Sequence, residues 1–189
     1  MDDKYQIIRG KRIENQLDDF ELFEQSTYND LERNVLNFIP VTTKRQHAVD
    51  PVRINSIELL PFIGTKNLNV DTIASSDGTN YSPKIIFNNV EFADEDLPDN
   101  VSFTGKDGNE YHVQAINLAQ NTLRVRCDCL DFYWRFAAFN AKDKSLIGAP
   151  PKPYQRKTNR GPANPQEVPG VCKHLIAAVK ALKHSGIVR

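Results

Sequence analysis

Two short pairs of metal-binding residues occur in the last third of the chain. Cys127 and Cys129 are separated by one residue, as are Cys172 and His174. Such a gap can place both side chains of a pair on the same side of a turn or at the start of a helix. Three thiolates and one imidazole make a closed tetrahedral ligand set for zinc, with no free position for water or substrate. The pattern predicts one structural zinc ion, because an iron–sulfur cluster would usually need a fourth cysteine and the chain has three.

Other interpretations of these residues stay open from the sequence. The first pair could form a strained disulfide, which would leave Cys172 unpaired. The three cysteines could also be unrelated buried thiols, with His174 on the surface. The remaining histidines are His47, His112 and His184. His184 is predicted to lie almost three helical turns beyond His174, too far to complete the same ligand set, whereas His112 in a predicted strand stays a possible ligand.

The charge of the chain changes sign near the first of these cysteines. The 24 basic and 24 acidic residues cancel overall. Residues 1–126 have a net charge of −7 (13 Lys and Arg, 20 Asp and Glu), and residues 127–189 have a net charge of +7 (11 Lys and Arg, 4 Asp and Glu). A dedicated DNA-binding protein usually has a basic overall balance. Parts of opposite charge instead favour contacts between protein subunits.

A basic, proline-rich segment lies between the two pairs. Residues 148–170 contain six prolines, which predicts a long and mostly extended loop. Its candidate contact residues for a protein partner or for nucleic acid are Lys152, Tyr154, Arg156, Lys157 and Arg160. Basic side chains beside an aromatic ring suit phosphate contact with base stacking, but docking onto an acidic protein surface fits them equally well. The aromatic residues at 132–136 are expected mainly to pack around the zinc.

Hydrophobic periodicity predicts a helix, a run of short strands and a final helix. The first helix follows the capping residues Ser26, Thr27 and Asn29 and ends before Pro40, and residues 1–27 could add a marginal amphipathic helix. Alternating apolar residues and regular turn signals then predict strands. These span residues 52–60, 66–73, 84–92, 101–104, 110–116 and 122–127. A short aromatic helix is predicted over residues 131–141 and a final helix over residues 173–183.

These elements predict an α+β fold with three segments. An antiparallel β meander or small barrel would carry an N-terminal helix and a C-terminal zinc-stapled hairpin–helix module. We expect an arm and helix over residues 1–51, an antiparallel β domain over 52–126 and a zinc module with a long Pro-rich loop over 127–189. Loss of zinc would then release residues 130–189 and leave the β domain folded.

Several functional classes are not supported by the sequence. It contains no recognisable nucleophile–base pair, phosphate-binding loop or open metal site, which predicts a protein that is not an enzyme. It has no run of about 18 apolar residues, so we expect no membrane span. The start of the chain, MDDKYQIIRGKR, lacks the apolar stretch of a secretory signal. An odd number of cysteines is also a poor disulfide framework, so we expect a reducing cytoplasm.

The order Cys-x-Cys, spacer and Cys-x-His resembles the SWIM-type zinc finger over about residues 110–185. The resemblance implies that the first pair ends a β-hairpin and that the second pair opens a helix. It also implies that the four zinc ligands are Cys127, Cys129, Cys172 and His174. The spacer of 42 residues is longer than in many members, so the family does not predict the inner loop. Members are proposed to bind DNA or other proteins.

A second resemblance extends over more of the chain. The stretches RCDCLDFYWRF, PPKPYQRKTNR and VPGVCKHL resemble small SWIM-containing proteins of tailed bacteriophages. This resemblance implies a virion component that binds neighbouring subunits and is assembled in the host cytoplasm. The main functional expectation is therefore a non-enzymatic, zinc-stabilised assembly protein. The alternative is a nucleic-acid-binding zinc-finger protein that uses its basic last third, with weak and sequence-tolerant binding.

Overall fold

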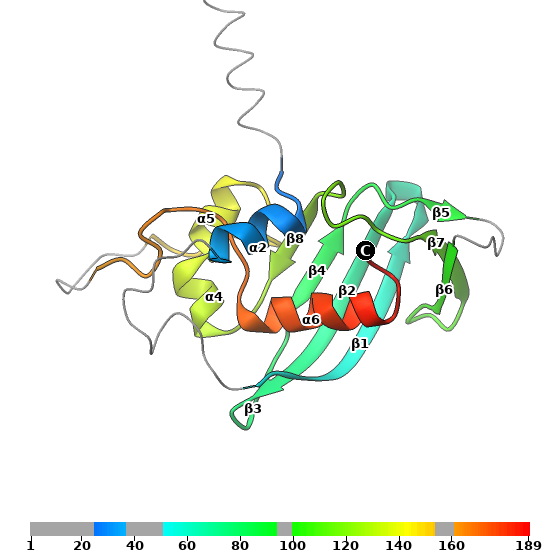
Figure 1. Ribbon diagram of the computed structural model, residues 1–189, viewed down its shortest axis with the longest axis horizontal. Helices are drawn as coiled ribbons and strands as arrows, with labels where there is room; N and C mark the ends of the chain where they lie inside the picture. Colours follow the sequence, from blue (N-terminus) through cyan, green and yellow to red (C-terminus); the bar gives the residue numbers. More distant parts are fainter. Residues whose placement is uncertain (1–24, 37–50, 94–99, 154–160) are drawn as a thin grey trace, which may run out of the picture.

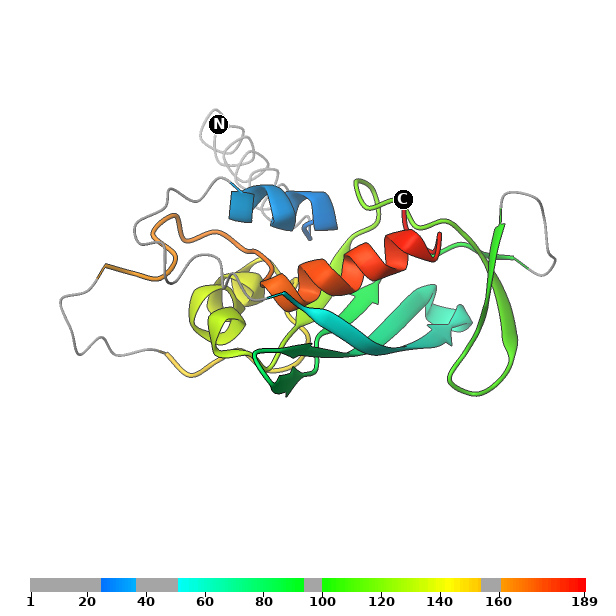
Figure 2. The same cartoon turned by 60° about the horizontal axis from the view of Figure 1, so that its bottom comes forward.

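The computed structural model describes residues 25–36, 51–93, 100–153 and 161–189. In these ranges the chain forms helices and two antiparallel sheets (Figure 1), which confirms the predicted α+β class. The larger sheet lies in the middle of the molecule, and the last helix crosses one of its faces (Figure 2). The predicted arm lies almost entirely outside the described residues.

The larger sheet is five-stranded and entirely antiparallel. Its strands are β1 (Arg53–Phe62), β2 (Asn67–Ser76), β3 (Thr79–Tyr81), β4 (Lys84–Phe87) and β8 (Leu123–Arg126), in the order β1-β2-β4-β8 with β3 beside the end of β2. A short 3-10 turn, η1 (Ile63–Thr65), joins β1 to β2. Every second residue of β2 from Leu68 to Ser76 is buried, so one face of this sheet belongs to the core.

The smaller sheet contains β5 (Phe92–Ala93), β6 (Asn100–Thr104) and β7 (Glu110–Gln114), in the order β5-β7-β6. The strand predicted over residues 84–92 is therefore two strands, β4 and β5, which belong to different sheets. The chain changes sheet at Asn88 and Asn89, where Asn89 has a left-handed φ of 55°. The side chain of Asn121 donates hydrogen bonds to both of their carbonyl oxygens (3.0 and 2.9 Å). The side chain of Asn121 thus binds the backbone at the point where the chain leaves β4.

The described helices are α2 (Tyr28–Leu36), α4 (Leu130–Arg135), α5 (Ala137–Lys142) and α6 (Lys173–His184). The segment predicted as one helix over residues 131–141 is thus two short helices. They meet at Phe136, whose φ of −118° lies outside the helical range and whose ring is fully buried. The last helix matches its predicted range to within one residue.

One hydrophobic core joins all of these elements. Leu175, Ala178, Val179 and Leu182 are at most 1% exposed and lie on the side of α6 that packs against β1 and β2. The same cluster of buried residues includes members of α2, both sheets and α4. The core therefore extends through the segments 1–51, 52–126 and 127–189, and their separate unfolding stays a prediction.

The C-terminal part of the Pro-rich segment is packed against the helices before it. Asn164 is 2% exposed, and its amide donates hydrogen bonds to the carbonyl oxygens of Arg135 and Val168. Asn140 of α5 exchanges two hydrogen bonds with the backbone of Gly170 (2.9 and 3.1 Å). Residues 148–153 and 161–170 contain no helix or strand, as the prolines predict.

None of the helices in the described part of the chain is long and apolar enough to cross a membrane.

Candidate metal centre

Two secondary-structure boundaries place the four predicted ligands. Cys127 follows the last residue of β8, and Cys129 is the N-cap of α4, where its Sγ accepts a hydrogen bond from the Phe132 backbone N–H (3.3 Å). Cys172 is the N-cap of α6, and His174 is the second residue of that helix. We call the first two residues the CxC pair and the last two the CxH pair. The strand end and the helix start therefore lie next to each other, as the pairs predict.

The ligand atoms of the two pairs converge on one point. One atom from each residue lies within 4.8 Å of every other, and all four residues are buried. His174 Nδ1 lies 3.8 Å from Cys127 Sγ and 3.9 Å from Cys172 Sγ, so Nδ1 is the nitrogen that faces the thiols. Nε2 of the same ring is buried and has no hydrogen-bond partner among the described residues. The cluster could hold one metal ion.

The structure does not support the competing interpretations. All three cysteines are free, and His174 is only 3% exposed. His112 lies in β7, where its Nδ1 is 2.9 Å from Ser102 Oγ. His184 is at the exposed end of α6, and its Nδ1 is 2.7 Å from the Lys180 carbonyl oxygen. Neither histidine belongs to the cluster, and His47 lies outside the described residues.

Burial and the neighbouring sulfurs shift the pKa values of the three thiols. Burial raises the pKa of the Cys172 thiol. The hydrogen bond between Cys127 and Cys129 raises the pKa of Cys127 and lowers the pKa of Cys129. A cation binds thiolates and displaces the thiol protons, so metal affinity would fall at low pH. Three sulfurs and one imidazole suit a metal that prefers soft ligands.

The aromatic residues after the CxC pair divide between the core and the surface. Phe132 and Phe136 are at most 1% exposed, as expected for packing near the ligands. Leu130, Tyr133 and Trp134 instead occupy one side of α4 at i, i+3 and i+4, with exposed fractions of 72%, 37% and 52%. We call these three residues the α4 face. The pattern of aromatic residues alone did not distinguish these two groups.

Of the candidate contact residues, Lys152 is exposed. Tyr154, Arg156, Lys157 and Arg160 lie outside the described residues, so their role as contacts stays a prediction. No pattern in the sequence indicated Tyr81, whose ring contacts His174 from the larger sheet. Asp128 and Lys173 could have been noticed, because each lies between the two ligands of a pair.

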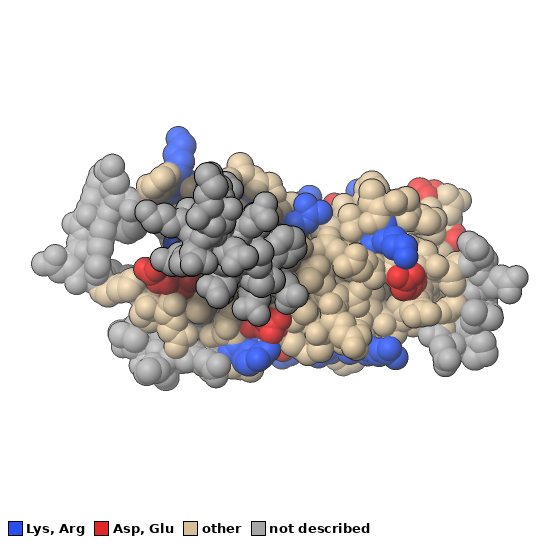
Figure 3. Space-filling view, turned by 90° about the horizontal axis from the view of Figure 1, so that it is seen from above, with Lys and Arg blue, Asp and Glu red and all other residues tan. Residues whose placement is uncertain are grey.

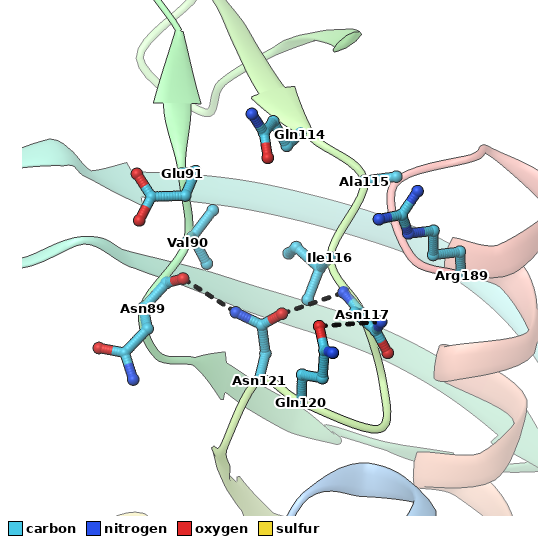
Figure 4. Close-up of a pocket in the computed structure, with 10 residues that line it drawn as sticks. All are labelled: Asn89, Val90, Glu91, Gln114, Ala115, Ile116, Asn117, Gln120, Asn121 and Arg189. Atoms are coloured by element: carbon cyan, nitrogen blue, oxygen red, sulfur yellow. Dashed lines mark hydrogen bonds between the residues drawn. The ribbon is translucent and has the colours of Figure 1, made fainter. Parts of the chain in front are cut away.

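A separate cavity of about 300 Å³ lies where the chain passes between the two sheets (Figure 4). The Asn121 side chain accepts a hydrogen bond from Asn117 N and donates one to Asn89 O, and Asn117 Nδ2 donates to Gln120 Oε1. The carboxamides therefore hold chain segments together. None of the four clustered ligands lines this cavity, which is therefore separate from the candidate metal centre.

Comparison with known proteins finds no family model, no curated protein and no solved structure that matches this chain. The resemblances to the SWIM-type finger and to phage proteins therefore stay predictions.

Proposed function

We propose that the cluster binds one zinc ion and that this ion has a structural role in a protein that is not an enzyme. The observation that supports this most is the burial of all four ligands, none more than 4% exposed. A complete set of four protein ligands leaves no position for a water molecule or a substrate. When bound, zinc would link the end of β8 to the start of α6 and would not act as a Lewis acid on a substrate.

Elemental analysis of protein purified without added metal tests the zinc site. We expect about one zinc and little iron per chain. Cys172→Ser should lose the metal, whereas His112→Ala, which changes a histidine outside the cluster, should keep it. A zinc content near zero in freshly reduced wild-type protein would refute the site.

We further propose that the protein is an assembly component and that the assembly is a tailed-phage virion. The α4 face supports this proposal, because exposed Trp, Tyr and Leu side chains on one side of a helix are unusual unless another surface covers them. Trp and Tyr are also the residue types that most often anchor protein interfaces. The complementary charges of residues 1–126 and 127–189 suit contacts between neighbouring protein subunits.

Mass spectrometry of purified particles tests the assembly role. We expect the chain to co-purify with virion subunits, and cross-links should involve residues next to the α4 face. Trp134→Ala should lower incorporation, whereas Phe62→Ala, which shortens an exposed aromatic residue of β1, should not. Absence of the chain from particles, or equal incorporation of the two variants, would contradict the proposal.

A nucleic-acid-binding protein is the second candidate. The net charge of +7 in residues 127–189 and the exposed ring of Trp134 favour it, because single strands bind to basic surfaces with stacking rings. In the view from above, however, the described basic side chains lie in separate small groups, some beside acidic ones (Figure 3). We expect binding that is lost between low and physiological salt. Tight, sequence-selective binding at physiological salt would favour this candidate.

A further inference from the structure

The residues inside the two ligand pairs attach the metal centre to one hairpin of the larger sheet. The β2–β3 hairpin consists of residues 67–81. Asp128, in the middle of the CxC pair, accepts a hydrogen bond at Oδ1 from the backbone N–H of Ser82 (2.9 Å), the residue that follows β3. Lys173, in the middle of the CxH pair, donates from Nζ to Oγ of Ser76, the last residue of β2 (2.6 Å). Both pairs are therefore fixed to the same hairpin.

The hairpin also contacts a ligand directly. The rings of Tyr81 and His174 are stacked, with centroids 4.2 Å apart and an interplanar angle of 27°. Tyr81 is only partly buried, whereas His174 is 3% exposed. The tyrosine is therefore the more exposed of the two stacked rings. These two residues are far apart in the sequence, so the contact depends on the position of α6 next to β2.

We infer that Tyr81 is a positioning residue for the metal centre and that the β2–β3 hairpin is a structural part of that centre. The inference rests on the proposed metal site and adds residues that are not ligands. The stacked tyrosine holds the His174 ring in the orientation that directs Nδ1 at the three sulfurs. Asp128 and Lys173 hold the backbone of each pair against the hairpin. The ligands are thus ordered by the larger sheet before a metal binds.

This arrangement affects both the affinity and the rate of metal release. A histidine ring that is free to turn about its χ2 angle loses that freedom on binding, whereas a stacked ring has already lost it on folding. Residues that orient metal ligands without touching the metal typically contribute about 10–100-fold to affinity. A chelator must also reach the ligands from solvent, and the stacked tyrosine ring covers one face of the imidazole. Removal of the ring should therefore accelerate release.

The test uses the full chain loaded with Co²⁺, whose absorption reports the thiolate–imidazole ligand set. Tyr81→Leu removes the flat ring, Tyr81→Phe keeps the ring and removes the hydroxyl, and Tyr133→Leu removes an exposed tyrosine on α4 that does not stack on His174. We expect Tyr81→Leu to release Co²⁺ to a chelator about 10–100 times faster than wild type. Tyr81→Phe and Tyr133→Leu should release it at close to the wild-type rate.

The outcomes separate this inference from the proposed zinc site. Equal release from Tyr81→Leu and Tyr133→Leu would refute the role of Tyr81 while leaving the site intact. A wild-type protein that takes up neither Co²⁺ nor Zn²⁺ would refute the site itself. If circular dichroism shows that Tyr81→Leu is unfolded at saturating metal, the comparison passes to Lys173→Met, with Lys180→Met on the exposed side of α6 as its control. Faster release from Lys173→Met alone supports the hairpin's role, and equal rates refute it.

Discussion

Removal of the metal is the perturbation that most directly tests how this fold is held together. The sequence predicts that residues 130–189 separate from a β domain that stays folded. The structure leads us to expect a different result, because α6 is the layer that covers the core face of the larger sheet. Its departure would expose buried residues of β2 such as Leu68 and Val70, which are 0% exposed. We therefore expect the metal-free chain to unfold in one cooperative step.

The free energy that α6 contributes to stability follows from its buried side chains. Leu175, Val179 and Leu182 are each at most 1% exposed, and full burial of such side chains contributes about 1.5–3 kcal/mol each. Together they contribute roughly 5–9 kcal/mol, which is comparable with the whole net stability of a typical domain. A sheet that lost α6 would consequently not stay folded by itself. The metal-free chain should keep α6 in place at moderate temperature but with a smaller free energy of unfolding.

Thermal unfolding with and without zinc measures this effect. Free zinc at about 1,000 times its Kd stabilises a folded protein by about 4 kcal/mol. Each kcal/mol shifts the Tm of a chain of this size by about 2–4 °C, so chelation should lower the Tm by roughly 8–16 °C. Cys172→Ser should unfold near the temperature of the chelated wild type and should not respond to zinc. Circular dichroism and the fluorescence of Trp134 should report the same transition.

Limited proteolysis provides the outcome that would refute this reasoning. Under the cooperative scheme, the chelated protein is cut throughout the chain once it begins to unfold, and no large fragment persists. A stable fragment that ends near residue 126 would instead show that the larger sheet folds without α6. Separate transitions in the circular dichroism signal and in the fluorescence of Trp134 would lead to the same conclusion.

Replacement of three buried residues elsewhere in the core should also change the stability of the protein. Gly170→Ala should lower stability by about 1–3 kcal/mol in urea titrations, because a Cβ would lie 2.7 Å from the Phe136 ring, whereas Gly161→Ala, with no atom within 4 Å of the added Cβ, should not. Asn140→Ala should cost about 1–3 kcal/mol in the same assay, because it leaves both buried backbone groups of residue 170 without partners. Burial raises the pKa of Tyr28 above its usual value. The stability that the neutral Tyr28 side chain contributes is therefore fully present below about pH 10 and is lost as pH rises further. In urea titrations from pH 9 to 11, wild type should lose up to about 1.4 kcal/mol of stability per pH unit from this group, and Tyr28→Phe should not show that loss.

The ligand pairs and the last helix were predictable from the sequence because their signals are local. A one-residue gap between Cys172 and His174 at the start of an apolar periodic segment defines both the helix start and the direction of its ligands. The division of the strands into two sheets was not predictable in this way. At the point of division, the carboxamide of Asn121 binds the carbonyl groups of Asn88 and Asn89 from a distant part of the chain. No local periodicity reports such a contact.

The same distinction explains why the residues that connect the ligand pairs to the β2–β3 hairpin were missed. Asp128 and Lys173 are adjacent to ligands, but their hydrogen bonds lead to Ser82 and Ser76, which are distant in the sequence. A hairpin can contact both pairs only after the larger sheet has brought the end of β8 next to the start of α6. The geometry of the candidate metal centre therefore depends on the larger sheet as well as on its four ligands. For that reason we expect metal binding and folding of the larger sheet to be thermodynamically linked, so that a substitution that weakens the β2–β3 hairpin also weakens metal affinity.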